Sequence, residues 1–384
     1  MKKIDRLVLK NFKAFRDQTF EFGGKNVLLY GNNGSGKSSL YWALYTFLQS
    51  SGKTDAQLQA YFQHFEEQNP ATFRSLKNVF APTDQDVLVE MTYVEDDGTK
   101  TIKTISPALI NTIGDAVLQK ANLASDFINY KLLQNFYNVT HKQEVNLWEV
   151  FWRDVFPYFE ENGKSYREQM ENLELPLIQE NQGNVNTFIS DETVVIAGDI
   201  AENGPEESPD EVLIENDIIQ EQFQLKLETI NNEILSFITQ IENNANDFLK
   251  AHFYEGKDFL KLLLKYKTTI DERWVREKND ALTNNKIPQG AEIKLWVSMY
   301  DAQTQQWIEN HRPQSFLNKA QLTRIALAIR IGALRTRPPR ENIDFRVLCL
   351  DDLLISLDMS NRHKVIKMLL NVDNNPALAF FDDY

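Results

Sequence analysis

Residues 31–38 read GNNGSGKS, the most informative motif of the chain. It matches G-x-x-x-x-G-K-[ST] at every fixed position. A continuous apolar run, Val27–Tyr30, precedes it, which is typical of a strand covered on both faces, and a helical stretch, Leu40–Leu48, follows it. Glycines let a backbone curl so that its N–H groups point at phosphate oxygens, and a helix N-terminus adds partial positive charge. The sequence therefore predicts a strand, a phosphate-binding loop and a helix, in that order.

Two side chains of this loop have expected chemical roles. Lys37 is expected to reach the β- and γ-phosphates of ATP as a catalytic group, and Ser38 to offer its hydroxyl to Mg²⁺. A glycine-rich turn that matches by chance is the alternative, and the strand and helix around the loop argue against it. The residues expected to contact the nucleotide here are Asn32, Asn33, Gly34, Ser35, Gly36, Lys37, Ser38 and Ser39.

The second half of such a site should be a carboxylate at the end of a buried strand. The apolar run Val347–Leu350 leads directly into Asp351 and Asp352. Asp351 is predicted to hold the magnesium ion together with Ser38, and Asp352 to orient or deprotonate the attacking water. The alternative is that two adjacent carboxylates simply mark the exit of a strand into a turn.

Composition limits the classes that remain. The chain has 384 residues, enough for two or three domains, and a formal net charge of −14, which argues against coating nucleic acid by bulk charge. Eight carboxylates and no Lys or Arg fall within residues 199–217. The single cysteine, Cys349, excludes an internal disulfide, and no apolar run is long enough to span a membrane. We expect a cytoplasmic protein without a membrane partner.

The chain divides by composition into four predicted segments. They are an N-terminal lobe with the glycine loop (1–160), an acidic, partly disordered insertion (161–220), a helical arm stub (221–256) and a C-terminal lobe (257–384). Strands are predicted over 4–10, 18–22, 26–30, 86–94, 99–105, 257–270, 291–300 and 347–350, and helices over 40–48, 221–248 and 319–335, with 114–160 mainly helical.

The arm stub has apolar residues at spacings of three and four over about four heptads. Two interpretations stay open: a short coiled-coil arm, or an amphipathic helix lying on its own lobe. The apolar positions are Phe223, Leu227, Ile230, Ile234, Phe237, Ile241, Ala245 and Phe248.

Four stretches resemble the SMC/RecF branch of ABC ATPases. They are IDRLVLKNFKAF (4–15), NVLLYGNNGSGKSSLYWAL (26–44), FLNKAQLTRIALAIR (316–330) and LCLDDLLISLD (348–358). The resemblance implies an α/β fold: an ABC-type P-loop head with two lobes and a short helical or coiled-coil insertion. It also implies a homodimer of heads with ATP and Mg²⁺ at the interface.

The resemblance adds further expected nucleotide contacts. Lys13 lies where related ATPases place a basic residue on phosphate, and Asp358 ends the D-loop. Asn318 and Gln321 belong to the signature motif, which faces the partner's nucleotide. The alternative for Lys13 is a solvated lysine, and the alternative for the signature motif is an ordinary core helix. The chain departs from the family at Asn318 and Ala320, where Ser and Gly are usual, and at Asp352, where many members have Glu, so slow hydrolysis is expected. It also ends at Tyr384 before any switch histidine.

Short-armed heads of this kind resemble the ATPases of bacterial anti-phage systems such as Lamassu and Septu. That resemblance implies a switch controlling DNA or a separate nuclease or effector subunit. A RecF-like role in recombination repair, or a non-hydrolysing ATP-dependent clamp, are the alternatives. An arginine-rich stretch could face DNA or pair with acidic surface: Arg324, Arg330, Arg335, Arg337, Arg340 and Arg346.

Overall fold

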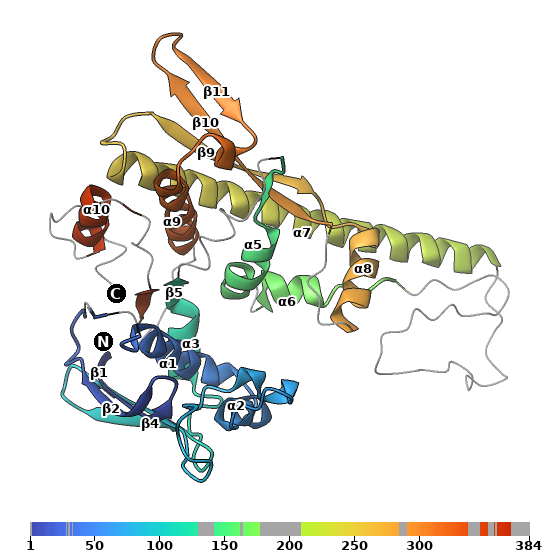
Figure 1. Cartoon of the computed structure of the whole chain (residues 1–384). Coiled ribbons are helices and arrows are strands. Elements are labelled where there is room, and N and C mark those ends of the chain that lie inside the picture. The colour runs from blue at the N-terminus through green and yellow to red at the C-terminus, as the bar shows by residue number, and fades with distance from the viewer. Residues whose placement is uncertain are drawn as a thin grey trace. The chain divides into compact units, whose positions relative to one another are not determined.

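The computed structural model describes residues 2–27, 29, 31–32, 34–129, 142–161, 164–176, 209–283, 290–336, 346–351, 357 and 359–369. The chain forms two compact units, Met1–Leu132 with Pro339–Tyr384, and Leu133–Pro338. Both units combine sheets and helices, so the predicted α/β class is confirmed (Figure 1). The four-segment division remains a prediction.

The first unit contains an antiparallel sheet with the strand order β2-β1-β3-β4. The sequence alternates along these strands, and the inward side chains of β1, such as Leu7 and Leu9, are fully buried. They share one apolar core with the first three helices of this unit. The elements are β1 (Lys3–Phe12), β2 (Phe15–Glu21), β3 (Leu88–Val94), β4 (Lys100–Ile105), α1 (Lys37–Gln49), α2 (Asp55–Phe62), α3 (Ala116–Ala124) and α10 (Met359–Leu369), with 3-10 turns at Ser50–Gly52 and Pro70–Arg74.

A second, parallel pair of strands lies in the same unit. It joins β5 (Asp126–Asn129) to β12 (Leu348–Asp351), with Asp351 opposite Asn129. Helix α1 contacts β12. The predicted strand over 347–350 is thus confirmed, one residue further along the chain.

The predicted strand over 26–30 is not confirmed where the structure describes it. Val27 and Leu29 belong to no strand, and their side chains are 50% and 42% exposed. Leu28 and Tyr30 lie outside the described residues. A strand covered on both faces needs neighbouring strands, and among the described residues the parallel pair has two members only.

The prediction that 114–160 is mainly helical is confirmed only in part, because strands interrupt the helices. Between α3 and α5 (Trp148–Asp154) the chain forms the strands β5 and β6 (Val145–Asn146). These strands are four and two residues long, which is too short for an alternating pattern to become visible in the sequence. Residues 130–141 lie outside the described part.

The second unit is built on α7 (Pro209–His252), a helix of 44 residues. Its buried face packs against α9 (Lys319–Thr336) and β9 (Leu260–Thr268), and β9 pairs with β10 (Glu292–Asp301) (Figure 1). The remaining elements are β11 (Gln306–Asn310), α6 (Tyr166–Glu171), α8 (Glu272–Thr283), the short pair β7 (Glu160–Glu161) and β8 (Lys164–Ser165), and 3-10 turns at Phe156–Tyr158 and Pro313–Ser315.

The apolar seam of the predicted arm is the buried face of α7. Every one of its eight predicted positions is at most 7% exposed. Gly332 of α9 lies so close that an added Cβ would stand 2.7 Å from the carbonyl oxygen of Ile241. The seam therefore matches the second interpretation, an amphipathic helix lying on its own lobe.

Helix α7 begins twelve residues earlier than the sequence predicted, at Pro209 rather than Glu221. Proline is well suited to a first helical position. The rest of the predicted insertion, up to residue 208, lies mostly outside the described residues. In the described part of the chain, no helix has the length and apolarity needed to cross a membrane.

Candidate nucleotide-binding site

The glycine loop bends through two residues with positive φ. Gly34 has a φ of 85° and Gly36 a φ of 93°, and Gly36 is the N-cap of α1. A Cβ on Gly36 would stand 2.6 Å from the ring of Phe15. Both the backbone angle and the space therefore require glycine at this position. The sequence analysis identified the glycine but missed Phe15 as the residue that the loop packs against.

Lys37 is the first residue of α1 and folds back over the loop. Its Nζ donates to the carbonyl oxygens of Gly31 at 2.8 Å and Asn32 at 3.0 Å. The ammonium group is thus already held at the mouth of the loop. An ammonium in this place is suited to donate to a phosphate oxygen in exchange for these two neutral acceptors.

Ser38 and Asp351 meet although they come from opposite ends of the sequence. The Ser38 hydroxyl donates to Oδ1 of Asp351 at 3.2 Å. Asp351 is 9% exposed and ends β12, whereas Ser38 is exposed on the first turn of α1. The two groups form one oxygen-rich point beside the phosphate-binding loop.

The donor set at this point fits a magnesium ion. A carboxylate and a hydroxyl are hard oxygen ligands, and Mg²⁺ is commonly held by one or two protein groups together with water and phosphate. Ser38 and Asp351 are the residues that would hold it. No group of three or more His, Cys, Asp or Glu side chains suited to a metal occurs in the part of the chain that the structure describes.

The strand that ends at Asp351 also carries the chain's single thiol, Cys349. Cys349 is a free thiol, and burial, together with the negative charge of Asp351, raises the pKa of Cys349 to about 12. The thiol therefore stays protonated and adds no charge to the site.

The turn between β1 and β2 is docked on the start of α1. The amide of Ala14 donates to the hydroxyl of Ser39 at 3.3 Å. The ammonium group of Lys13 lies 5.3 Å from the centre of the Trp42 ring, and the Lys13 backbone has a φ of 45°. This unusual backbone angle and the ring contact bring Lys13 to the helix that carries the loop. The phosphate contact that the resemblance implied for Lys13 remains a prediction.

The described residues do not cover the whole predicted site. Asn33, Asp352 and Asp358 lie outside them. The structure brings together Lys13, Asn32, Gly34, Ser35, Gly36, Lys37, Ser38, Ser39 and Asp351 within the first unit.

The two predicted signature residues form a capping box in the second unit. The Asn318 side chain accepts from the amide of Gln321 at 2.9 Å, and the Gln321 side chain accepts from the amide of Asn318 at 3.1 Å. These contacts begin α9, and Asn318 is exposed. Its side-chain NH₂ group can still serve as a donor while Oδ1 holds the helix.

The arginines of α9 are directed into their own lobe. Arg330 is 5% exposed and donates to the carbonyl oxygen of Asp154. Arg324 and Arg335 lie over the rings of Phe253 and Phe248. These three arginines thus pack within their own lobe. Arg337 and Arg340 lie outside the described residues, and both interpretations of the arginine-rich stretch stay open.

Comparison with known proteins assigns the family. Residues 6–294, well over half of the chain, match the AAA domain family, and the chain belongs to that family. A segment of 51 residues is 39% identical to the DNA replication and repair protein RecF of Acetivibrio thermocellus and spans 13% of either protein. The resemblance to RecF seen in the motifs is thereby confirmed over this segment.

Solved structures give looser likenesses. A structure of the recombination mediator protein RecF with ATP is 16% identical, with 95% of this chain and 89% of that chain covered and a TM-score of 0.44. An Smc head domain from Pyrococcus furiosus is 12% identical, with 96% and 86% covered and a TM-score of 0.45. Both TM-scores are low, so the family assignment rests on the sequence match.

Proposed function

We propose that the chain is an SMC/RecF-like ATPase that binds and hydrolyses ATP and dimerises around it as a switch. The contact between Ser38 and Asp351 beside the glycine loop is the observation that carries this proposal. It brings the two expected magnesium ligands together directly after Lys37, whose ammonium group already lies at the mouth of the loop. Such an arrangement serves phosphoryl transfer, in which catalysis is mostly positioning and charge stabilisation.

Each residue has one part in the proposed reaction. Lys37 binds the β- and γ-phosphates, and Ser38 and Asp351 hold Mg²⁺, which neutralises phosphate charge when bound. Asp352, directly after β12, orients the attacking water or takes its proton. Its side chain is one methylene shorter than the glutamate of many relatives, so hydrolysis is slow.

The switch depends on a second copy of the chain. Asn318 of one head donates its side-chain NH₂ to the γ-phosphate held by Lys37 of the other head, and Asp358 completes the same interface. ATP then joins the two heads, and loss of the γ-phosphate releases them. The two states differ in subunit contacts, which is how such a switch passes on its signal.

The proposed pathway is anti-phage defence, with the dimer controlling DNA or a separate nuclease or effector subunit. The aspartate at position 352 and the resemblance to Lamassu- and Septu-like ATPases favour it. A RecF-like role in DNA repair is the alternative, and it is favoured by the segment shared with RecF. A non-hydrolysing clamp is the third possibility, and measurement of phosphate release separates it from the other two.

The direct test is ATP-dependent association of Asp352→Asn. Removal of a general base lowers the rate by about 10²–10⁴-fold and leaves binding intact, so this variant should accumulate as an ATP-bound dimer. Light scattering with and without ATP measures this, and Lys37→Ala is the control that should stay monomeric. An Asp352→Asn protein that binds ATP and remains monomeric would contradict the proposal.

A further inference from the structure

The sheet of the second unit has one buried face and one more exposed face. Leu262 and Leu264 of β9 are buried, and α7 lies along the outer edge of β9, where its Asn246 side chain bonds the backbone of Leu262 at both its N–H and C=O. Side chains alternate along a strand, so the odd-numbered residues of β9 lie on the opposite face. Those residues are Lys261, Leu263, Lys265 and Lys267.

The neighbouring strands place aromatic rings on the same face. Leu263 pairs with Trp296 of β10, and Lys261 with Ser298, so Trp296 and Tyr300 share the face of the lysines. Tyr300 in turn pairs with Trp307 of β11, and their rings lie 5.4 Å apart. The face thus interleaves lysines with aromatic side chains.

The three lysines of this face rest on indole rings. The ammonium group of Lys261 lies 4.2 Å from the ring centre of Trp307, and those of Lys267 and Lys265 lie 4.5 Å and 5.9 Å from that of Trp296. Within the described residues none of the three forms a salt bridge. A cation held over a ring keeps its N–H donors available to an anion.

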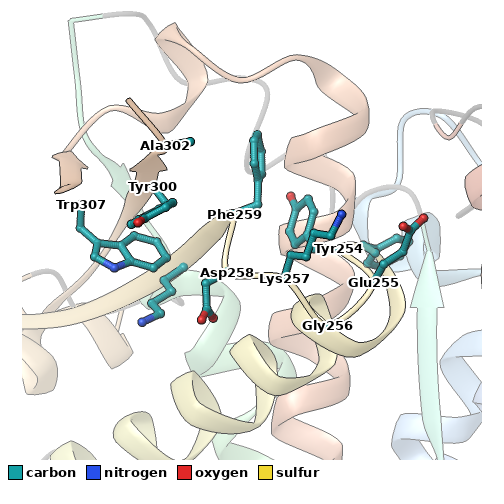
Figure 2. Close-up of a pocket in the computed structure, with 11 residues that line it drawn as sticks. Tyr254, Glu255, Gly256, Lys257, Asp258, Phe259, Tyr300, Ala302 and Trp307 are labelled. Atoms are coloured by element: carbon teal, nitrogen blue, oxygen red, sulfur yellow. The ribbon is translucent and has the colours of Figure 1, made fainter. Parts of the chain in front are cut away.

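One end of this face is hollowed. The hollow has a volume of about 910 Å³ and is lined by Tyr300, Trp307 and Lys261 of the sheet together with the segment that links α7 to β9 (Figure 2). That segment adds Phe259, whose side chain is 46% exposed, beside Tyr254 at 5.2 Å between ring centres. Aromatic side chains that remain open to solvent therefore lie next to the three lysines of this face.

Carboxylates also lie around this face. Asp258 pairs with Lys250 at 3.0 Å. Glu309 contacts His311 at 2.8 Å, and Glu144 accepts from the indole of Trp296 at 2.9 Å. Within the described part of the chain, none of these three carboxylates forms a salt bridge with a lysine of this face.

We propose that this face binds single-stranded nucleic acid. Lys261, Lys265 and Lys267 contact phosphates along the bound strand, and the six-residue step from Lys261 to Lys267 covers roughly 20 Å. Phe259 and Trp307 offer rings on which unpaired bases stack. Surfaces that bind single strands combine these two features, a cationic track for the backbone and aromatic platforms for the bases.

The proposal goes beyond the ATP-dependent dimer, and its binding test needs no ATP. Fluorescence anisotropy of a labelled oligothymidylate of roughly 20 nucleotides, longer than the usual single-strand site, measures binding. The key variant replaces Lys261, Lys265 and Lys267 together by glutamine, which keeps most of each side-chain stem. Its matched control makes the same change at three other exposed lysines, Lys120, Lys164 and Lys226.

The lysine variant should bind at least tenfold more weakly at low salt, whereas the control should bind like the wild type. The plot of log affinity against log salt should also lose a slope of about 2, since each neutralised phosphate of a single strand contributes roughly 0.7. Phe259→Ala, at an exposed position, should weaken binding by about tenfold through lost stacking. Melting temperatures check that each variant is folded.

Four results would overturn the proposal, and three of them concern the oligonucleotides. They are wild-type protein that does not bind the oligonucleotide, a lysine variant that binds it equally well, and a duplex of the same length that binds more tightly. Polyglutamate that competes as well as the oligonucleotide would show a general polyanion surface without base stacking, and would also overturn it. ATP hydrolysis measured on the same proteins separates these failures from a failure of the proposed ATPase function.

Discussion

The Ser38 hydroxyl donates a hydrogen bond of 3.2 Å to Oδ1 of Asp351, across 313 positions of sequence. The contact exists because α1 begins one residue before Ser38 and packs against β12, whose last residue is Asp351. Two short motifs from distant parts of the chain therefore meet at one point of the first unit.

This pair should make ATP binding depend on magnesium. Ser38→Ala and Asp351→Asn should each reduce the gain in ATP affinity that Mg²⁺ gives over EDTA, because each removes one expected oxygen ligand. The double variant should lose little more than either single variant, since groups that act on one ion are not additive. Titration with a fluorescent ATP analogue in both buffers measures the effect. Equal magnesium dependence in all four proteins would refute the assignment.

Lys37→Ala should abolish ATP binding without unfolding the protein. The ammonium group makes two hydrogen bonds to loop carbonyls in the free protein, but with nucleotide it becomes a charge-assisted phosphate contact of about 1.5–3 kcal/mol. Equilibrium binding and a melting curve test both halves of this statement. Lys120→Ala, at an exposed position of α3, is the control for loss of a positive charge. Unchanged affinity in Lys37→Ala would sink the assignment.

Gly36→Ala should disturb the loop, and Gly52→Ala should not. Gly36 has a φ of 93° and no room for a Cβ against Phe15, whereas a Cβ on Gly52 would meet nothing within 4 Å. An L-residue in the left-handed region costs about 1–2 kcal/mol, and the contact with the ring adds to this. Urea unfolding and ATP binding should both weaken in Gly36→Ala alone. A second change, Phe15→Leu, should recover part of the loss, and no recovery would show that the ring contact is unimportant.

The sequence predicts those parts of the site that lie in local motifs of fixed spacing, and it misses those that depend on long-range contacts. The loop GNNGSGKS and the run before Asp351 have fixed spacing, and the structure joins them. Phe15 could not be found this way, because its role depends on which turn packs against α1. The strand β5 is only four residues long and gains its identity from pairing with β12, a long-range contact that no local pattern contains.

In the second unit, the apolar seam of α7 correctly predicted a buried face but left its partner open. Periodicity reports that a face is apolar and does not say what covers it. The answer lies at Gly332, whose missing side chain lets α9 approach the backbone of α7 at Ile241. The signature residues differ from this, because a local pattern contains the contact that the structure shows. Asn318 followed three positions later by Gln321 is a capping-box pattern, which could have been predicted from the sequence.

Acidification should destabilise the second unit through His252. Burial, together with the charge of Arg335, lowers the pKa of His252 from its ordinary 6.5 to about 4. Between these values the unfolded chain binds a proton that the folded protein does not, so stability is full above pH 6.5 and falls as the pH drops toward 4. With allowance for partial exposure, the loss from pH 7 to pH 5 is roughly 1 kcal/mol.

Urea unfolding at pH 7 and pH 5 measures this dependence. His252→Gln should flatten it, because glutamine does not titrate, and His363→Gln, at an exposed position, should leave it unchanged. Equal pH dependence in wild type and His252→Gln would show that other groups are responsible.

The signature residue Asn318 should act in two ways that can be separated. The sequence analysis expected it to contribute to the ATP-dependent dimer, but its Oδ1 also caps α9. Asn318→Ala should therefore lose about 0.5–2 kcal/mol of stability, the usual cost of removing an N-cap. Asn318→Asp and Asn318→Ser should keep the cap, because both side chains accept from the same amide.

These two variants isolate the proposed contact with the partner's nucleotide. Serine loses the amide donor and aspartate places a negative charge where the γ-phosphate is expected, so both should bind ATP normally as monomers. Dimerisation should then need about tenfold more protein for Asn318→Ser, the equivalent of roughly 1.4 kcal/mol, and still more for Asn318→Asp. Melting curves and ATP-dependent sedimentation on the same samples measure both quantities. If the two variants melt and dimerise like the wild type while Asn318→Ala only melts earlier, Asn318 is a helix cap without a role across the interface.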